Sequence, residues 1–398
     1  MIRIGISAEF MGAKRNGTAT YSRNLLHGLA ALHGEDQFYA YLSARSALPL
    51  LPEAGNIRPR MVYPYNAYLR LAAMLPLELL RRPVDVLHAQ GWGPVWSPCP
   101  MVLTVHDIGW ESFPEIYPKA LALRLSYLVR SSARRAALII ASSRYTANDL
   151  QRIYQVPAEK IRVIYPSLSS DIARVEDPAA IEQARSRYGI PSRYILYVGS
   201  IEPKKNVHRL IQAYAALRRE RQVEQPLVIA GRPLWLSQPI LDLPAQLGIE
   251  GHVIFTGPAR QEDLSALYSG ADVFAFLGMY EGFGYPPLEA MACGTPVLAA
   301  NRTSLPEVLG DAALLADPDR EDDVAAGLAR LLDDPELRAQ LRARGLRRAE
   351  QFQLAPHACQ VLEVYGECAA RVKRTLTPQP PLPSWERASR GSERGEGR

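Results

Sequence analysis

Short apolar runs alternate with helical patterns along nearly the whole chain, and this alternation leaves few folds open to it. The runs that suit buried strands are residues 2–7, 84–88, 101–105, 138–141, 161–164, 194–198, 226–230, 252–255, 273–276 and 296–299. Between them, Leu and Ala recur three and four residues apart, as in residues 21–32, 207–218 and 324–332. Apolar strands separated by helices indicate parallel sheets with helices on both faces.

A polar, turn-rich stretch near residues 167–190 divides this pattern into two sets. A chain of 398 residues is also long for a single hydrophobic core. We therefore predict an α/β fold with two doubly wound, Rossmann-like domains at residues 1–180 and 181–354. Residues 355–374 are expected to form a final helix. Residues 375–398, rich in Pro, Gly, Ser and charge, are expected to be a disordered tail, with a Pro-rich docking peptide as the alternative.

The net charge of +5 is concentrated at the end of the chain. Residues 371–398 hold seven Arg or Lys and three Glu, so the rest of the chain carries a net charge of only +1. A protein that binds nucleic acid would normally carry a basic face within its folded part. We therefore expect no nucleic-acid partner.

The cysteines and the apolar stretches indicate a cytoplasmic protein. No two of the four cysteines form a CxxC pair, so neither a zinc site nor a disulfide framework is expected. The first residues do not read as a secretory signal. No uninterrupted apolar stretch reaches the length of about 20 residues that a membrane span needs. The cysteines are Cys99, Cys293, Cys359 and Cys368.

The most specific motif is YEGFGYPPLEAMACGTPV, at residues 280–297. Glu281 and Glu289 flank a turn in which Gly282 and Gly284 allow a close backbone approach, and two prolines suit the first turn of a helix. Amides at such a helix start face polyhydroxylated or anionic ligands. A carboxylate accepts two hydroxyl hydrogen bonds well, so a ribose diol is a natural partner for Glu289. The structural alternative is a simple helix cap.

A second motif, VGSIEPKKNV at residues 198–207, places two lysines between a strand and a helix. The strand is expected to end at Gly199, and Lys204 and Lys205 precede a helix that begins near Asn206. Basic side chains at the carboxyl end of a strand suit a diphosphate whose negative charge grows during a reaction. The alternative is a solvated basic helix start.

Two weaker features lie in the first half of the chain. His106 and Asp107 directly follow a strand, at the edge where such sheets bind ligands. Gly17 and Thr18 lie in RNGTATYSRNLL, a flexible turn that leads into a helix. This turn is not a dinucleotide-binding fingerprint, because no GxGxxG follows the first strand.

Together these motifs resemble those of the retaining glycosyltransferases of family 4. The resemblance covers residues 1–373, is most specific over residues 195–310, and is greatest to bacterial mannosyltransferase-type members that build surface polysaccharides. It implies the GT-B fold, in which the two domains face each other across a cleft and the final helix packs back on the first domain. Supporting matches are Ser142-Ser143, Gly231-Arg232 and the SLPEV motif at residues 304–308.

The resemblance also implies roles for individual residues. It places Glu281 beside the donor sugar, makes Glu289 the ribose ligand, and directs Lys205 to the diphosphate. Many members carry an Arg where this chain has Ser200, so Lys204 and Lys205 would carry more of that charge. The resulting catalytic set is His106, Glu281 and Lys205, and the donor-binding set is Gly17, Gly199, Ser200, Lys204, Lys205, Gly282, Phe283, Gly284, Tyr285 and Glu289.

The expected function is transfer of a hexose, with mannose favoured, from a nucleotide-sugar donor such as GDP-mannose to a glycan or lipid-linked acceptor. Anomeric configuration would be retained, and neither a cofactor nor a metal is expected. A nucleotide-sugar epimerase of the same fold and a non-catalytic nucleotide-sugar-binding protein are the alternatives.

Residues 65–82, YNAYLRLAAMLPLELLRR, read as an apolar helix with basic ends that Pro76 interrupts. Such a helix could cradle a lipid-linked acceptor or touch a membrane surface, which would place the protein at the inner face of the membrane. The alternative is a core helix.

Overall fold

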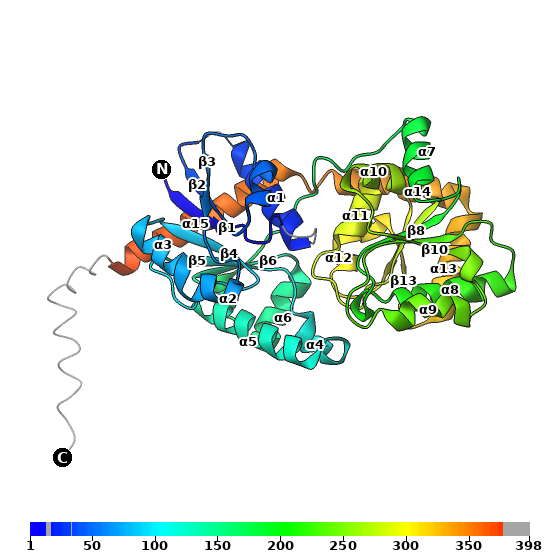
Figure 1. The fold of residues 1–398 in the computed structure, drawn as a ribbon, viewed down its shortest axis with the longest axis horizontal. Helices are drawn as coiled ribbons and strands as arrows, with labels where there is room; N and C mark the ends of the chain where they lie inside the picture. Colours follow the sequence, from blue (N-terminus) through cyan, green and yellow to red (C-terminus); the bar gives the residue numbers. More distant parts are fainter. Residues whose placement is uncertain (13–16, 33, 377–398) are drawn as a thin grey trace, which may run out of the picture.

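Two parallel β-sheets organise the computed structural model, which describes residues 1–12, 17–32 and 34–376 (Figure 1). The first sheet has the strand order β3-β2-β1-β4-β5-β6-β7, and its neighbouring strands are all parallel. Its strands are β1 (Arg3–Ser7), β2 (Gln37–Leu42), β3 (Ile57–Met61), β4 (Val86–Gln90), β5 (Met101–Val105), β6 (Leu138–Ala141) and β7 (Ile161–Val163).

The second sheet has the order β10-β9-β8-β11-β12-β13 and is parallel as well. Its strands are β8 (Ile195–Val198), β9 (Leu227–Ala230), β10 (Val253–Gly257), β11 (Val273–Phe276), β12 (Val297–Ala300) and β13 (Leu314–Ala316). The predicted fold class, an α/β protein with two Rossmann-like sheets, is confirmed.

Helices cover both faces of each sheet, as Figure 1 shows most clearly for the second one. The helices associated with the first sheet are α1 (Gly17–Ala30), α2 (Ala67–Leu69), α3 (Leu75–Arg81), α4 (Gly109–Ser112), α5 (Lys119–Arg135) and α6 (Arg144–Tyr154). Those that follow are α7 (Pro178–Arg187), α8 (Val207–Glu220), α9 (Gln238–Gln246), α10 (Gln261–Ser269), α11 (Tyr285–Ala292), α12 (Leu305–Leu309), α13 (Glu321–Asp333), α14 (Pro335–Ala349) and α15 (Leu354–Leu376). Shorter 3₁₀ turns are η1 (Arg45–Leu50), η3 (Pro114–Ile116), η4 (Ala158–Lys160), η5 (Pro203–Lys205), η6 (Glu250–His252) and η7 (Gly310–Ala312).

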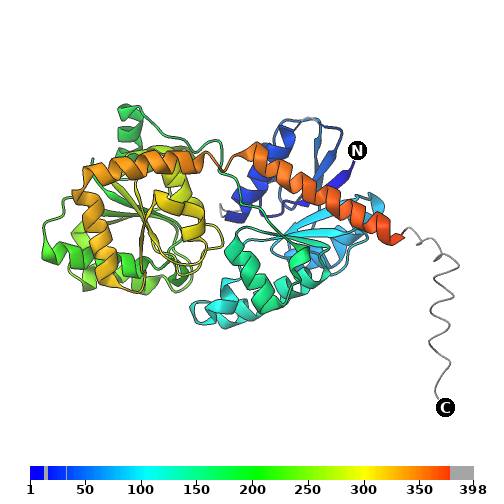
Figure 2. The ribbon, with the colours of Figure 1, turned by 180° about the vertical axis from the view of Figure 1, so that it is seen from behind.

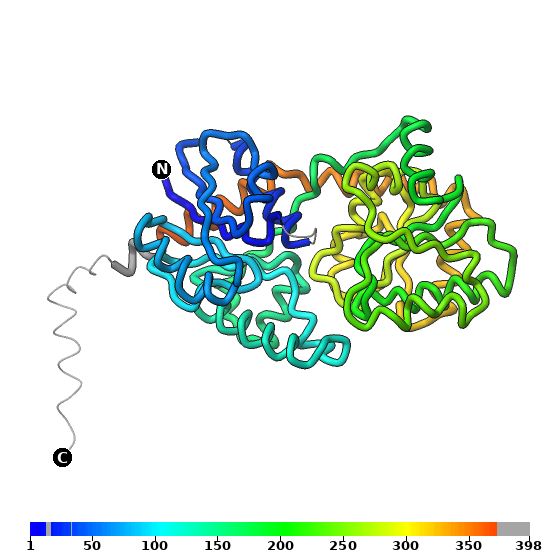
Figure 3. The backbone as a smooth tube through the Cα atoms, viewed as in Figure 1, coloured from blue at the N-terminus to red at the C-terminus, as the bar shows by residue number. Residues whose placement is uncertain are grey.

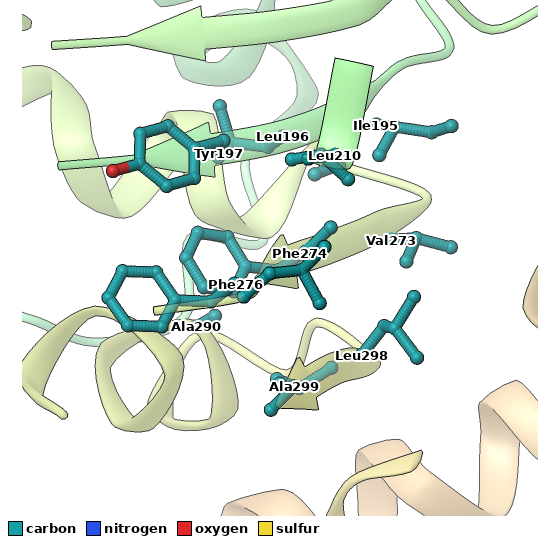
Figure 4. Close-up of a cluster of buried hydrophobic side chains, with 14 of the residues drawn as sticks. Ile195, Leu196, Tyr197, Leu210, Val273, Phe274, Phe276, Ala290, Leu298 and Ala299 are labelled. Carbon is teal, nitrogen blue, oxygen red and sulfur yellow. The ribbon is translucent and has the colours of Figure 1, made fainter. Parts of the chain in front are cut away.

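The core of the second domain fixes the two strands that lead into its long loops. Tyr197 of β8 stacks on Phe276 of β11 with ring centroids 5.9 Å apart, and Phe276 stacks on Phe274 at 6.2 Å (Figure 4). Such aromatic pairs contribute about 0.5–1.5 kcal/mol each beyond the burial of their area. The ends of β8 and β11 are therefore held rigidly relative to each other.

The chain passes between the two sheets twice. It leaves the first after β7 and reaches α7 through residues 164–177, and it returns in α15, so that two segments connect the halves (Figure 3). Ala358, Val361 and Tyr365 of α15 are fully buried in the core of the first domain. Figure 2 shows α15 lying along the back of that domain. The first domain is thus built from both ends of the chain. The expected tail at residues 375–398 lies, from residue 377 on, outside the described residues.

The prediction that Pro76 interrupts the helix of residues 65–82 is wrong. A π-helical turn, η2 (Arg70–Met74), joins α2 to α3 without a break, and Pro76 lies in the first turn of α3. The altered hydrogen-bond spacing of a π turn and the fixed φ of proline at a helix start make this position tolerable. Inside this segment Arg70 is buried and forms an ion pair with Glu9.

The close contact between α1 and α15 generates a stability prediction. A Cβ added to Gly28 of α1 would lie 2.8 Å from the carbonyl oxygen of Leu354 and 2.9 Å from Cβ of Ala358. We expect Gly28→Ala to lower the free energy of unfolding by about 1–3 kcal/mol, because the two helices must separate. Chemical denaturation measures the change.

Gly366→Ala is the matched control within α15, since an added Cβ there meets nothing within 4 Å. It should raise the free energy of unfolding by up to about 1 kcal/mol through helix propensity alone. Equal effects of the two substitutions would contradict this account of how α15 is anchored.

Candidate active site

The candidate residues lie on loops that follow the carboxyl ends of three strands. His106 and Asp107 follow β5, Lys204 and Lys205 follow β8, and Glu281 lies in the loop between β11 and α11. Parallel strands bring their carboxyl ends to one edge of a sheet, which is where α/β proteins bind ligands. The loops at the edges of the two sheets contact one another, so that all five residues belong to one site.

The turn at residues 280–284 is fixed by its own backbone and by two hydroxyl side chains. Gly284 has φ 101°, a conformation that favours glycine, and a Cβ there would lie 2.6 Å from the side chain of Leu305. Ser304 Oγ donates hydrogen bonds to the carbonyl oxygens of Glu281 at 2.8 Å and Phe283 at 3.2 Å. The Glu281 N–H in turn donates to Thr303 Oγ1 at 3.1 Å.

Helix α11 begins immediately after this turn, with Pro286 and Pro287 in its first turn as predicted. Because proline has no N–H, Tyr285 is the only one of the first three helical residues that can offer a backbone amide to a ligand. Glu289 lies one turn further on and is buried, and its Oε2 accepts a hydrogen bond from the hydroxyl of Tyr268 at 2.8 Å. The carboxylate is thereby held in one orientation.

Two lysines on the β8 loop are paired with carboxylates. Lys205 Nζ lies 2.8 Å from Oε1 and 3.0 Å from Oε2 of Glu281. Lys204 Nζ lies 2.8 Å from Oδ2 of Asp107, and this pair joins the two domains. Burial acts to lower the pKa of Lys204, but the charge of Asp107 outweighs it and holds that pKa well above the ordinary value. Burial likewise acts to raise the pKa of Asp107, and Lys204 holds it below the ordinary value.

The backbones of the two domains touch directly beside these pairs. A Cβ added to Gly282 would lie only 1.7 Å from the carbonyl oxygen of His106, so any larger residue is excluded. Ser142 Oγ donates to the carbonyl oxygens of His106 at 2.6 Å and Gly282 at 3.0 Å. One hydroxyl therefore joins the loop after β5 to the turn before α11.

Further contacts across the domain boundary involve residues that the sequence analysis missed or named only as motif matches. Tyr280 donates to Oδ2 of buried Asp149 at 2.6 Å. The carboxylate of Glu307, from the SLPEV motif, accepts the N–H groups of Arg144 at 2.7 Å and Tyr145 at 3.1 Å at the start of α6. The only sequence signal for these contacts was a serine pair after a strand and a carboxylate in a short motif, and neither indicates its partner.

His106 lies at this boundary as a neutral imidazole. Its ring packs edge-on against Tyr21 with centroids 4.9 Å apart. Burial lowers the pKa of His106 to about 4. Within the described part of the chain, its Nε2 and the hydroxyl of Tyr285 are buried and have no hydrogen-bond partner. Buried polar atoms are normally satisfied, so both are available to a ligand.

The glycines of the site lie at close approaches. Gly17 is the first residue of α1, and a Cβ there would lie 3.8 Å from the ring of Tyr285. The first two residues of the predicted glycine-containing turn, 15 and 16, lie outside the described residues. Gly199 packs under Gly231, whose added Cβ would meet the Gly199 carbonyl oxygen at 1.7 Å. The hydroxyl of Ser200 donates to Oε1 of Glu202 at 2.6 Å.

No group of three or more His, Cys, Asp or Glu side chains within the described residues is placed to hold a metal ion. The four cysteines are unpaired. The described helices include none that is long and apolar enough to cross a membrane.

Hollows of about 440 Å³ between α8 and α13 and about 240 Å³ beside α1 are not lined by the site residues, which contact one another instead.

Two Rossmann-like domains that meet at the carboxyl edges of their sheets, with a final helix that returns to the first, define the GT-B class. Family models match both halves: "Glycosyltransferase Family 4" over residues 15–171 and "Glycosyl transferases group 1" over residues 181–348. The chain belongs to the glycosyltransferase family whose two halves these models describe, and it is therefore a sugar-transferring enzyme.

Individual relatives agree with this assignment. The chain is 36% identical over 265 residues to O-antigen chain mannosyltransferase B of Escherichia coli, which is 66% of this chain and 69% of that protein. It is 32% identical over 260 residues to the serotype-specific mannosyltransferase WbdA of the same species, covering 64% of this chain but only 31% of WbdA. The structure of Anabaena Alr3699/HepE in complex with UDP and glucose is similar with a TM-score of 0.73 at 21% identity, over 92% of this chain and 100% of HepE.

The Gly282–His106 contact leads to a prediction about domain arrangement. We expect Gly282→Ala to force the loops apart and to weaken domain association by at least about 1 kcal/mol. The radius of gyration in small-angle X-ray scattering should rise as a result. Gly251→Ala is the control, since a Cβ there meets nothing within 4 Å. Unchanged scattering by Gly282→Ala would show that the loops do not meet in solution.

Three histidines make stability depend on pH: His88 and His357 are buried, and His106 is partly buried. Burial lowers the pKa of His88 to about 3 and the pKa values of His106 and His357 to about 4. Unfolded histidines have a pKa of about 6.5, so protons bind preferentially to the unfolded chain below that pH. The stabilisation from the neutral histidines is therefore complete above pH 6.5 and is lost as the pH falls toward 4.

Between pH 5.5 and 4.5, we expect His357→Gln to reduce the slope of the free energy of unfolding against pH by about 1.4 kcal/mol per pH unit, the effect of one proton. Urea denaturation at a series of pH values measures the slope. His27→Gln, at an exposed position, is the matched control. A His357→Gln slope equal to that of the unmodified protein would mean that His357 is protonated in the folded state.

Proposed function

We propose that this protein is a retaining, metal-independent hexosyltransferase. It takes a hexose, with mannose favoured, from a nucleotide-sugar donor such as GDP-mannose and transfers it to a glycan or lipid-linked acceptor. The support for mannose is the similarity to two relatives named as mannosyltransferases. The UDP in the HepE structure keeps uridine donors open for this chain. A cytoplasmic location stays a prediction.

One observation carries the proposal: two lysines lie where the sheet edges meet, each paired with a carboxylate. Lys205 is largely buried against Glu281, and Lys204 against Asp107. A buried ammonium needs an anionic partner. The carboxylates fill that role in this structure, and the diphosphate of a bound donor can pair with the same ammonium groups. As the sugar leaves, negative charge grows on the diphosphate, and a lysine already in place stabilises it without reorganisation. In this proposal the lysines and the start of α11 do the work that a divalent cation does in other enzymes.

Helix α11 supports binding of the rest of the donor. Its amino end carries the positive partial charge of a helix start, and the Tyr285 amide lies there. Glu289, held by Tyr268, can accept two hydrogen bonds from a ribose diol. The turn amides of Phe283 and Gly284 would contact sugar hydroxyls.

His106 fits a contact with the donor sugar. With a pKa of about 4 it is neutral at neutral pH, so its Nε2 can donate to or accept from one hydroxyl. Asp107, engaged with Lys204, is the better candidate for positioning the lysine than for proton transfer. His106 therefore orients the sugar in this proposal and is not the nucleophile.

Retention is proposed to occur by attack on the same face from which the diphosphate leaves. The bond between the anomeric carbon and the phosphate oxygen breaks, the acceptor oxygen bonds to that carbon, and the acceptor proton moves to the leaving phosphate. Glu281 is the alternative nucleophile, but both of its oxygens contact Lys205. Proton NMR of the first product gives the anomeric configuration, and a sugar–Glu281 adduct seen by mass spectrometry would replace this mechanism with a covalent one.

A donor screen tests the proposal. Donor at 100 times its dissociation constant should stabilise the protein by about 2.7 kcal/mol, visible as a shift of the unfolding midpoint. We expect one of GDP-mannose, UDP-glucose or UDP-N-acetylglucosamine to do so and Lys205→Ala to abolish the shift. Arg219→Ala, which removes a charge exposed on α8, should leave the shift unchanged. If no nucleotide sugar or free nucleotide stabilises the protein, the proposed function is wrong.

The same donors separate the remaining alternatives. An epimerase would convert the donor sugar without an acceptor, whereas a transferase would only hydrolyse it slowly. A binding protein would be stabilised and would release no nucleoside diphosphate. Measuring nucleoside diphosphate release and sugar identity together therefore distinguishes the three cases.

A further inference from the structure

Large apolar side chains are exposed in three segments of the first domain. Eleven of the sixteen exposed large apolar side chains that are identified in the described residues fall within residues 63–80, 95–96 and 123–127. Single exposed apolar residues are normal in monomeric proteins, but clustered ones mark a surface that is covered in function. The term apolar face is used below for the surface formed by Tyr68, Leu69, Leu77, Trp96, Leu123 and Tyr127.

The three segments are neighbours in space. The guanidinium of Arg124 on α5 lies 5.9 Å from the ring centroid of Tyr68 on α2. The Val95 N–H donates to the carbonyl oxygen of Leu71 at 3.4 Å, which joins the short loop to the π turn after α2. Figure 1 shows α2, α3 and α5 along the same side of the first domain. The exposed side chains therefore belong to one surface.

Helix α5 shows that this exposure is not part of the core. Its buried positions include Ala122, Val129 and Ala133, which form the side that packs on the domain. Leu123 and Tyr127 are one turn apart and are 74% and 73% exposed. Residues spaced by four lie on the same side of a helix, so α5 has a second apolar stripe that faces away from the domain.

The charges around the apolar face are mostly basic. Helix α5 contains Lys119, Arg124, Arg130, Arg134 and Arg135 and no acidic residue. At the end of α3, Arg81 and Arg82 are exposed, and the carboxylate of Glu78 lies 3.7 Å from Arg82. A second copy of the protein would present the same basic surface, and the like charges of the two surfaces would repel each other. Apolar side chains among basic ones match the interface of a bilayer that contains anionic lipids.

We propose that the apolar face binds the first domain to an anionic phospholipid bilayer. The exposed aromatic and aliphatic side chains enter the headgroup region, and the arginines contact lipid phosphates. The attachment is peripheral. It is consistent with a lipid-linked acceptor, but it does not depend on the proposed donor or reaction.

The position of α5 connects this surface with the site. The helix begins two residues after Tyr117, whose ring stacks on Trp235 of the second domain with centroids 6.2 Å apart. Trp235 Nε1 also donates to the carbonyl oxygen of Ile116 at 3.2 Å. The amino end of α5 therefore lies at the boundary between the domains, so an acceptor anchored in a bilayer against the apolar face would arrive near the candidate active site.

Co-sedimentation of the full chain with vesicles tests this proposal. Vesicles of phosphatidylcholine alone are compared with vesicles containing phosphatidylglycerol at one third of the lipid. We expect the protein to bind the anionic vesicles at least tenfold more tightly, and 0.5 M salt to weaken that binding. The variant Leu123→Glu with Tyr127→Glu should reduce binding to anionic vesicles at least tenfold.

Leu236→Glu, at a 60% exposed position in the second domain, is the matched control and should bind as the unmodified protein does. For the charges, Arg134→Glu with Arg135→Glu is compared with Arg344→Glu with Arg347→Glu on α14. The first pair should weaken binding by about fivefold or more for each charge, and the second pair should not. Circular dichroism checks that each variant is folded.

Two results would overturn the proposal. One is no binding of the unmodified protein to anionic vesicles. The other is equal binding by the α5 variants and their controls. If the unmodified protein instead forms a dimer that Leu123→Glu with Tyr127→Glu dissociates, the face binds a second copy. Donor-induced stabilisation of the same α5 variant is unaffected in every case, so failure here leaves the proposed function standing.

Discussion

The contact between Gly282 and the carbonyl oxygen of His106 is the constraint around which the two domains are arranged. It leaves no room for a side chain, and Ser142 joins the two carbonyl oxygens with one hydroxyl. Because the turn of residues 280–284 leads directly into α11, the same contact sets the position of the α11 amino end relative to the first domain. The relative placement of Lys204 and Asp107 depends on it as well.

The two lysines of the site stay charged although they are largely buried, because each is paired with a carboxylate. Lys204 and Asp107 hold each other in the charged state, as the directions of their pKa values indicate. Removing either member would leave a buried charge without compensation, which costs several kcal/mol. An anionic ligand therefore has to compete with carboxylates that already fit. Ligand affinity and domain association are therefore linked through the ammonium group of Lys204.

Much of this architecture could be predicted from the sequence, because parallel strands are short, apolar and regularly interrupted by helices. Glu281 and the lysines could be placed after strand ends for the same reason, and Glu289 one turn into the helix that follows. The pairing of Lys204 with Asp107 and the capping of α6 by Glu307 could not, because they depend on how two domains approach each other. Edge strand β3, with Pro59 inside it, and the π turn before Pro76 have too little periodicity to be recognised.

Because of helix α15, the core of the first domain is completed by residues that are synthesised after the second domain. Ala358, Val361, Tyr365 and Cys368 are fully buried in a core whose other members come from the beginning of the chain. During synthesis, the ribosome makes the whole second domain before these residues exist. The first domain therefore cannot complete its core until the second domain has been translated and has had time to fold. In the order of folding, the domain encoded first is completed last.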